Sequence, residues 1–236
     1  MSNKAASNEP QRETLSTKII AIGLLLIALL STAVALNHPE PATRNDATAT
    51  ALASIAGQTP ANFSVHATLI VLMLLTAIGM NGLTRKLGCN SQLIMAAMAT
   101  MGLSMLSMSL AALVNGFVVP IWASAYPVPL TPESDAAARM ILTFASSLNR
   151  VFANTAVLLS SLSLLFFGIS FAAKQGTLRL VGGLGCMIGL GTVIGLLNGA
   201  FILDYDGFNL TNALFYIWIA TFASHVLLAK SELDGF

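Results

Sequence analysis

The residues best suited to binding or catalysis are a few polar side chains near the ends of predicted helices. They are His66, Arg150, Asn154, Asn198, Asp204 and Asp206. A guanidinium would pair with either carboxylate, and imidazole with carboxylates is a common ligand set for divalent cations. We therefore expect these six residues to form an outward-facing ligand-binding cluster. The alternative is that they only line the water interface and cap helix ends.

Recognised catalytic motifs do not accompany this cluster. The sequence contains no HExxH, no GxSxG, no phosphate-binding loop and no dinucleotide-binding glycine pattern. The spacing of Asp204 and Asp206 is too common to indicate a transferase by itself. We predict no catalytic residues and no cofactor, and the identity of any metal stays unknown. A membrane-embedded enzyme using Asp204, Asp206 and His66 is kept as an alternative.

The composition indicates that a bilayer surrounds these residues. The chain is 56% hydrophobic and 9% charged, whereas a soluble domain carries about 25% charged residues. Its mean hydropathy is +0.79. A net charge of +1 gives no basic patch for nucleic acid. The chain therefore lacks the charge to cover itself with a water-soluble surface, and the lipid bilayer is its first expected partner.

Six stretches are long and apolar enough to cross a bilayer, which takes about 20 helical residues. They are Lys18–Leu36, His66–Thr84, Gln92–Asn115, Val151–Ala173, Leu178–Phe201 and Leu210–Leu228. Because lipid cannot satisfy unpaired backbone groups, these stretches should be helical. The sequence predicts an all-α polytopic bundle of six transmembrane helices over residues 18–229. A disordered N-terminal tail over residues 1–17 and a short C-terminal tail over residues 230–236 are predicted to flank the bundle.

The first helix has a second interpretation. Its apolar run ends at Ala33-Val34-Ala35, which resembles a signal-peptide cleavage site. The run from Ile19 to Leu36 is 18 residues long, however, and a cleaved signal usually has about 7–15. We expect the helix to be retained.

The charges predict an orientation. Eight of the 11 Lys and Arg residues fall on one side of the predicted topology. Positive charge marks the cytoplasmic side, so both termini are predicted to be cytoplasmic, in a bacterial plasma membrane. The outer connections are then 37–65, 116–150 and 202–209. Within the second, Ser134–Asn149 should be helical, with Ser134 or Asp135 as its N-cap, and should run into the fourth transmembrane helix.

Glycines on the fifth helix predict close helix packing. Gly185, Gly189, Gly191, Gly195 and Gly199 include several GxxxG spacings, which let helix backbones approach each other in lipid. We expect this helix to lie centrally, between two neighbours. A flexible gating helix is the alternative.

Two further stripes have helical spacing. On the third helix, Met95, Met98, Met101, Met105 and Met108 share a face. They could form a Cu(I) path, but packing is the simpler interpretation. On the fourth helix, Arg150, Asn154, Ser161 and Gly168 form a polar line that Arg139, Thr143 and Ser146 extend. Polar groups in a bilayer face the protein interior, so this line should point inward.

This layout resembles a family of uncharacterised bacterial six-helix membrane proteins, known as a domain of unknown function. The resemblance rests on the first helix, the segment DATATALASIA over 46–56, and the charged turn LTRKLG over 83–88. It covers most of the chain. It implies the six-helix fold, but no activity and no site residues.

Three functional classes follow. The first is a non-enzymatic binding or accessory protein whose outward polar cluster meets a lipid, a small solute or a membrane-protein partner. The second is a small-solute or metal-ion transporter or channel along the polar line of the fourth helix. The third is the enzyme described above. The absence of charge in the middle of the predicted helices disfavours an ion-coupled pump.

Overall fold

The computed structural model of this chain describes residues 9–36, 47–87, 91–126, 129–198 and 205–228. Within these ranges it is helical and contains no strand. The helices are α1 (Glu9–Leu36), α2 (Thr48–Gly57), α3 (Thr59–Lys86), α4 (Gln92–Leu113), a π-helical turn η1 (Val114–Val118), α5 (Val119–Ala125), α6 (Pro132–Ala172), α7 (Thr177–Leu197) and α8 (Tyr205–Leu228).

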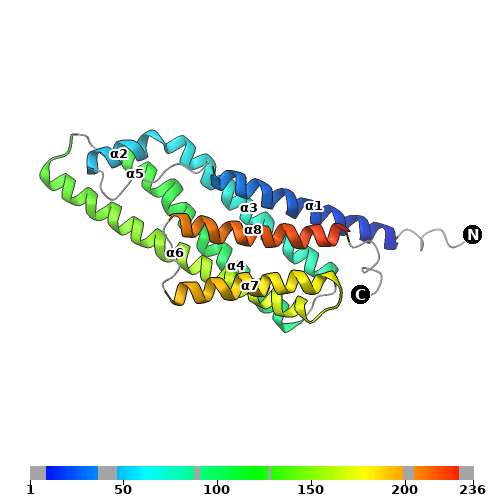
Figure 1. The fold of residues 1–236 in the computed structure, drawn as a ribbon. Coiled ribbons are helices and arrows are strands. Elements are labelled where there is room, and N and C mark those ends of the chain that lie inside the picture. Colours follow the sequence, from blue (N-terminus) through cyan, green and yellow to red (C-terminus); the bar gives the residue numbers. More distant parts are fainter. Residues whose placement is uncertain (1–8, 37–46, 88–90, 127–128, 199–204, 229–236) are drawn as a thin grey trace, which may run out of the picture.

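Six helices are long and apolar enough to cross a membrane, which confirms the predicted six-helix architecture. Five of them are α1, α3, α6, α7 and α8. The sixth is the continuous helical run from Gln92 to Ala125, which comprises α4, the π-helical turn and α5. They pack in the cyclic order α1, α3, α4, α6, α7, α8, and α8 returns to α1. α6 and α8 also touch each other across the bundle. The start of α1 and the end of α8 lie at the same end (Figure 1).

An aromatic cluster fills the bundle where α6 meets α8. It consists of Phe167, Phe171, Trp218 and Phe222, whose side chains are all fully buried. Their ring centroids lie 5.0 to 6.2 Å apart. The indole nitrogen of Trp218 donates to the carbonyl oxygen of Val181 on α7 at 3.0 Å. This satisfied, close-packed cluster joins three helices in one core.

α6 is much longer than a bilayer crossing requires. Its 41 residues extend about 60 Å at 1.5 Å per residue, twice the thickness of a hydrocarbon core. α7 runs antiparallel beside it, with Gly182 against Ala172 and Gly189 against Ser161. The far end of α7, Leu197, therefore reaches the level of Asn154. The first twenty or so residues of α6 extend beyond it.

This extension belongs to a small lobe formed by α2, α5 and the first half of α6. Leu52, Ala123 and Ala138 form its buried core. The hydroxyl of Tyr126 donates to the Ser134 carbonyl oxygen at 2.8 Å. At the lobe tip, the Thr48 hydroxyl and the Arg139 guanidinium lower the pKa of Asp135. The lobe therefore has its own apolar and polar contacts outside the six-helix core.

Several predicted boundaries differ from the structure. Connections predicted over 37–65 and 116–150 are largely helical where the structure describes them, and α8 begins at Tyr205, inside the predicted connection 202–209. The predicted helix Ser134–Asn149 does run into the fourth transmembrane helix. Its N-cap is Thr131, however, whose side chain accepts from the Ser134 N–H while the Ser134 hydroxyl accepts from the Thr131 N–H. Thr131 precedes Pro132, a favoured first helical residue.

Candidate functional site

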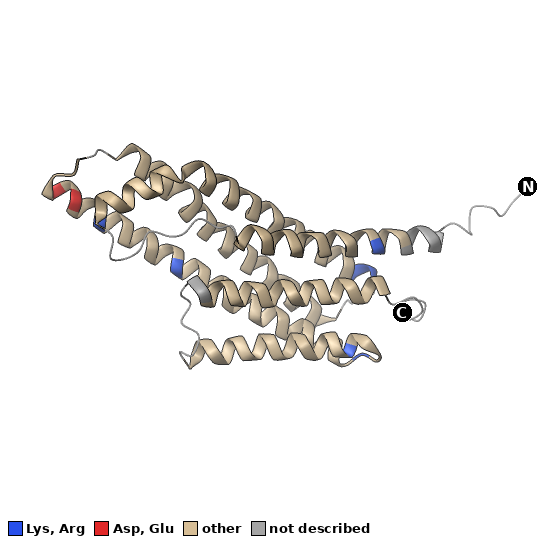
Figure 2. Ribbon diagram, turned by 45° about the horizontal axis from the view of Figure 1, so that its top comes forward, with Lys and Arg blue, Asp and Glu red and all other residues tan. Residues whose placement is uncertain are grey.

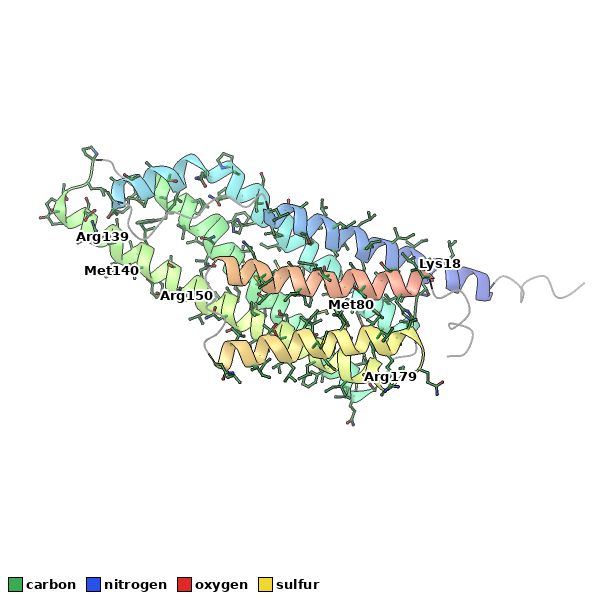
Figure 3. The ribbon with its side chains drawn as sticks, viewed as in Figure 1. Lys18, Met80, Arg139, Met140, Arg150 and Arg179 are labelled. Atoms are coloured by element: carbon green, nitrogen blue, oxygen red, sulfur yellow. The ribbon has the colours of Figure 1, made fainter. Side chains whose placement is uncertain are left out.

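Arg150 and Asn154 lie on α6 at the level where α7 ends. Both side chains are exposed. Figure 3 places Arg150 on α6 with Arg139 further toward the lobe, and Lys18 and Arg179 at the opposite end of the bundle. These two members of the predicted ligand-binding cluster are therefore accessible.

His66 is in a different environment. Its side chain is only 3% exposed, and its Nδ1 lies 2.8 Å from the carbonyl oxygen of Asn62. Since a carbonyl oxygen can only accept, Nδ1 carries a proton and donates. A β-carbon added to Gly116 would overlap the His66 side chain. The side chain of His66 is thus packed against the π-helical turn. His66 was predicted to begin its helix, but α3 begins several residues earlier, at Thr59.

The remaining members of the predicted cluster are Asn198, Asp204 and Asp206. Asn198 is exposed and caps the end of α7, where its N–H donates to the Ile194 carbonyl oxygen. Asp204 lies outside the described residues, as does the side chain of Asp206. Among the residues that the structure describes, no three His, Cys, Asp or Glu side chains gather to hold a metal. The convergence of Asp204, Asp206 and His66 stays a prediction.

The glycines of α7 divide between two faces. Gly185 and Gly189 face α6, where a β-carbon on Gly189 would lie 2.6 Å from the Ser161 carbonyl oxygen. Gly195 is buried. Gly191 is exposed, with no atom within 4 Å of an added β-carbon, and Gly199 lies outside the described residues. α7 therefore lies between two neighbours, α6 and α8, but at the edge of the bundle rather than at its centre (Figure 1).

The polar line on α6 does not point inward along its whole length, contrary to the sequence-based expectation. Ser161 and Gly168 are buried against α7. Arg150 and Asn154 are exposed, and so are Arg139, Thr143 and Ser146. The difference arises because α7 ends where the exposed half begins.

α4 and α6 are joined by two hydroxyl groups that donate across the interface. Ser104 donates to the Ala156 carbonyl oxygen, and Ser163 donates to the Ala97 carbonyl oxygen, each at 2.8 Å. On α4, Met101 and Met105 lie in the core, whereas Met95 is 60% exposed. Most of the methionine stripe is packed into the core, which agrees with its interpretation as packing.

A continuous heptad stripe, which was not among the sequence-based predictions, runs along α6. It begins with six exposed residues, which we call the uncovered stripe: Met140, Phe144, Ser147, Val151, Asn154 and Leu158. It continues with four residues that meet α7: Ser161, Leu165, Gly168 and Ala172. Successive members are alternately four and three residues apart, the spacing of a coiled-coil seam.

The uncovered stripe mixes apolar and polar groups. Met140, Phe144 and Val151 are 70%, 67% and 59% exposed. Ser147 and Asn154 lie between them and offer hydrogen-bonding groups, with Arg150 beside the stripe. The same stripe that binds α7 through close backbone contacts thus remains open for about five helical turns.

Family models, curated proteins and solved structures contain no match to this chain. The functional interpretation is therefore based on the geometry of α6.

Proposed function

We propose that this protein is a non-enzymatic accessory protein of the membrane that binds another polypeptide through the uncovered stripe of α6. The observation that supports this most is the continuity of the stripe. Its second half is a helix-packing surface, occupied by α7, and its first half repeats the same spacing without an occupant.

The chemistry of the uncovered stripe favours a polypeptide over lipid or water. Lipid tails would suit Met140 and Phe144 but would leave the amide of Asn154 without a hydrogen-bond partner. Water would suit Asn154 but would leave the large apolar groups exposed. Another helix can meet both needs, because its side chains can bury the apolar groups and supply a hydrogen-bond partner for Asn154.

A transporter along α6 receives less support. Such a protein needs a continuous polar passage from Arg150 past Ser161. In the described residues, Ser161 donates to the Val157 carbonyl oxygen of its own helix at 2.7 Å. Beyond it, the backbone of Gly168 packs directly on α7. These contacts among the described residues give no support to a polar passage between α6 and α7.

The charge distribution supports an orientation for this proposal. Figure 2 shows basic residues at the end where α1 begins, acidic residues at the lobe tip, and basic residues along α6. The acidic pair is Glu133 and Asp135, in the first turn of α6. Because positive charge favours the cytoplasmic side, we place both termini in the cytoplasm and the lobe outside a bacterial plasma membrane.

Site-specific photo-cross-linking tests the proposed function. A photoreactive phenylalanine analogue replaces Phe144 or Val151 in cells that express the full chain. Matched controls carry it at Ile78 on α3 or Met187 on α7, which are 67% and 69% exposed at mid-helix positions. We expect protein adducts from the stripe positions and none from the controls. Equal adducts at all four positions, or none at Phe144 and Val151, would refute the proposal.

A further inference from the structure

The spacing of the uncovered stripe suits a particular kind of partner. Its six members extend from Met140 to Leu158, about 27 Å along the helix. A repeat of 3.5 residues keeps facing a partner helix only when the two helices wind around each other with a left-handed twist. The occupant should therefore be a long helix that runs nearly parallel or antiparallel to α6.

We infer that this occupant is α6 of a second copy of the chain, lying parallel and in register; this inference rests on the function proposed above. Two copies inserted into one membrane with the same orientation are related by a twofold axis along the membrane normal. Two α6 helices that meet at this axis must run in the same direction. Each stripe residue then meets its own counterpart.

Asn154 is the residue that most favours a second copy. In the symmetric arrangement its side chain faces the same side chain of the other chain. An amide carries both donors and an acceptor, so two identical amides can satisfy each other. A single asparagine in a coiled-coil seam is known to select the register and the number of strands. A seam with Phe144, Val151 and Leu158 alone would allow slipped registers.

Charges on α6 do not oppose this pairing. Arg139 is held by Asp135 on the same helix, with 2.9 Å between its Nε and a carboxylate oxygen, and lies off the stripe. Arg150 flanks the stripe on one side, so its counterpart in the symmetric dimer lies on the opposite side. Ser147, at the middle of the stripe, is small enough for the two helices to approach closely.

Disulfide cross-linking in native membranes tests the inference. The native cysteines are first replaced (Cys89→Ala and Cys186→Ala), and single cysteines are placed on the stripe by Ser147→Cys or Val151→Cys. Controls carry Ser146→Cys, which lies on the same helix but off the stripe, or Met187→Cys on the exposed side of α7. Because these exposed positions carry little packing, the folded chain should be retained, as checked by its melting temperature.

We expect a covalent dimer of twice the chain mass from the two stripe variants, at several-fold higher yield than from the controls. Asn154→Asp should reduce the yield at Val151→Cys, because it places two like charges in the seam. Uniform dimer yield at stripe and control positions would overturn the inference. Absence of dimer, combined with a photo-adduct of a different mass at Phe144, would also overturn it while leaving the proposed function intact. Absence of both products refutes both.

Discussion

Gly168 and Gly182 bring the backbones of α6 and α7 into direct contact. A β-carbon on Gly168 would lie 2.9 Å from the Gly182 carbonyl oxygen and 2.5 Å from the Cys186 backbone nitrogen. Neither neighbour is a flexible side chain that could rotate away. The interface therefore depends on the missing β-carbons, as expected for helices that associate by close packing in lipid.

Gly168→Ala should force α6 and α7 apart. We expect a loss of about 1–3 kcal/mol, the usual cost of adding a methyl group to a packed core, seen as a lower melting temperature in detergent. Gly183→Ala on α7 is the control, since its added β-carbon meets no atom within 4 Å. The close-contact interpretation is wrong if both variants melt alike.

Ser163→Ala should weaken the α4–α6 interface, because its hydroxyl donates to the Ala97 carbonyl oxygen on the other helix. Hydrogen bonds between helices in membranes contribute about 0.6 kcal/mol on average, so a loss of this size is expected in thermal or denaturant unfolding. Ser109→Ala provides the control, because its hydroxyl donates to the Met105 carbonyl oxygen within α4. A larger loss from Ser109→Ala would contradict the expectation.

Gly116→Ala should disturb the packing of His66 against the π-helical turn, since the added methyl group overlaps the imidazole-bearing side chain. We expect faster hydrogen exchange in α3 residues 59–68 and in the adjacent turn, with the rest of the bundle unchanged. Gly102→Ala, where space is open, should exchange like the wild type. Unchanged exchange around His66 would show that the turn accommodates a side chain.

Thr131→Ala should loosen the first turn of α6, because it removes the side-chain oxygen that accepts from the Ser134 N–H. Loss of such a cap costs about 1 kcal/mol. Limited proteolysis should then cut within residues 129–137 sooner than in the wild type. Thr143→Ala, on the exposed surface of the same helix, serves as the control, and equal cleavage of the two variants would argue against the cap.

The six long helices were predictable because hydropathy alone identifies an apolar run of bilayer length. Their ends were not, for local reasons. The apolar run of α3 begins near His66, but the helix begins at Thr59, where Pro60 suits the first turn. Pro120 falls within the connection predicted over 116–150, yet it lies in the first turn of α5, directly after the π-helical turn. Hydropathy therefore placed the start of α3 too late and ended the third helix too early.

The candidate site was harder to predict than the fold. Arg150 and Asn154 were expected to face inward because polar groups usually do. Their exposure depends on where α7 ends relative to α6, a long-range property of the packing. The heptad spacing from Met140 to Ala172 is visible in the sequence, but the same spacing occurs whether a helix of the same chain covers the stripe or leaves it open.

The unbroken length of α6 has a mechanical consequence. The same helix carries the contacts with α7 and part of the lobe. A change in the tilt of α6 within the bundle would therefore also move the lobe. With about 30 Å of helix beyond the end of α7, a change in tilt of about 10° would move the lobe tip by about 5 Å. Because helix tilt responds to bilayer thickness, the lobe position would report the thickness of the surrounding membrane.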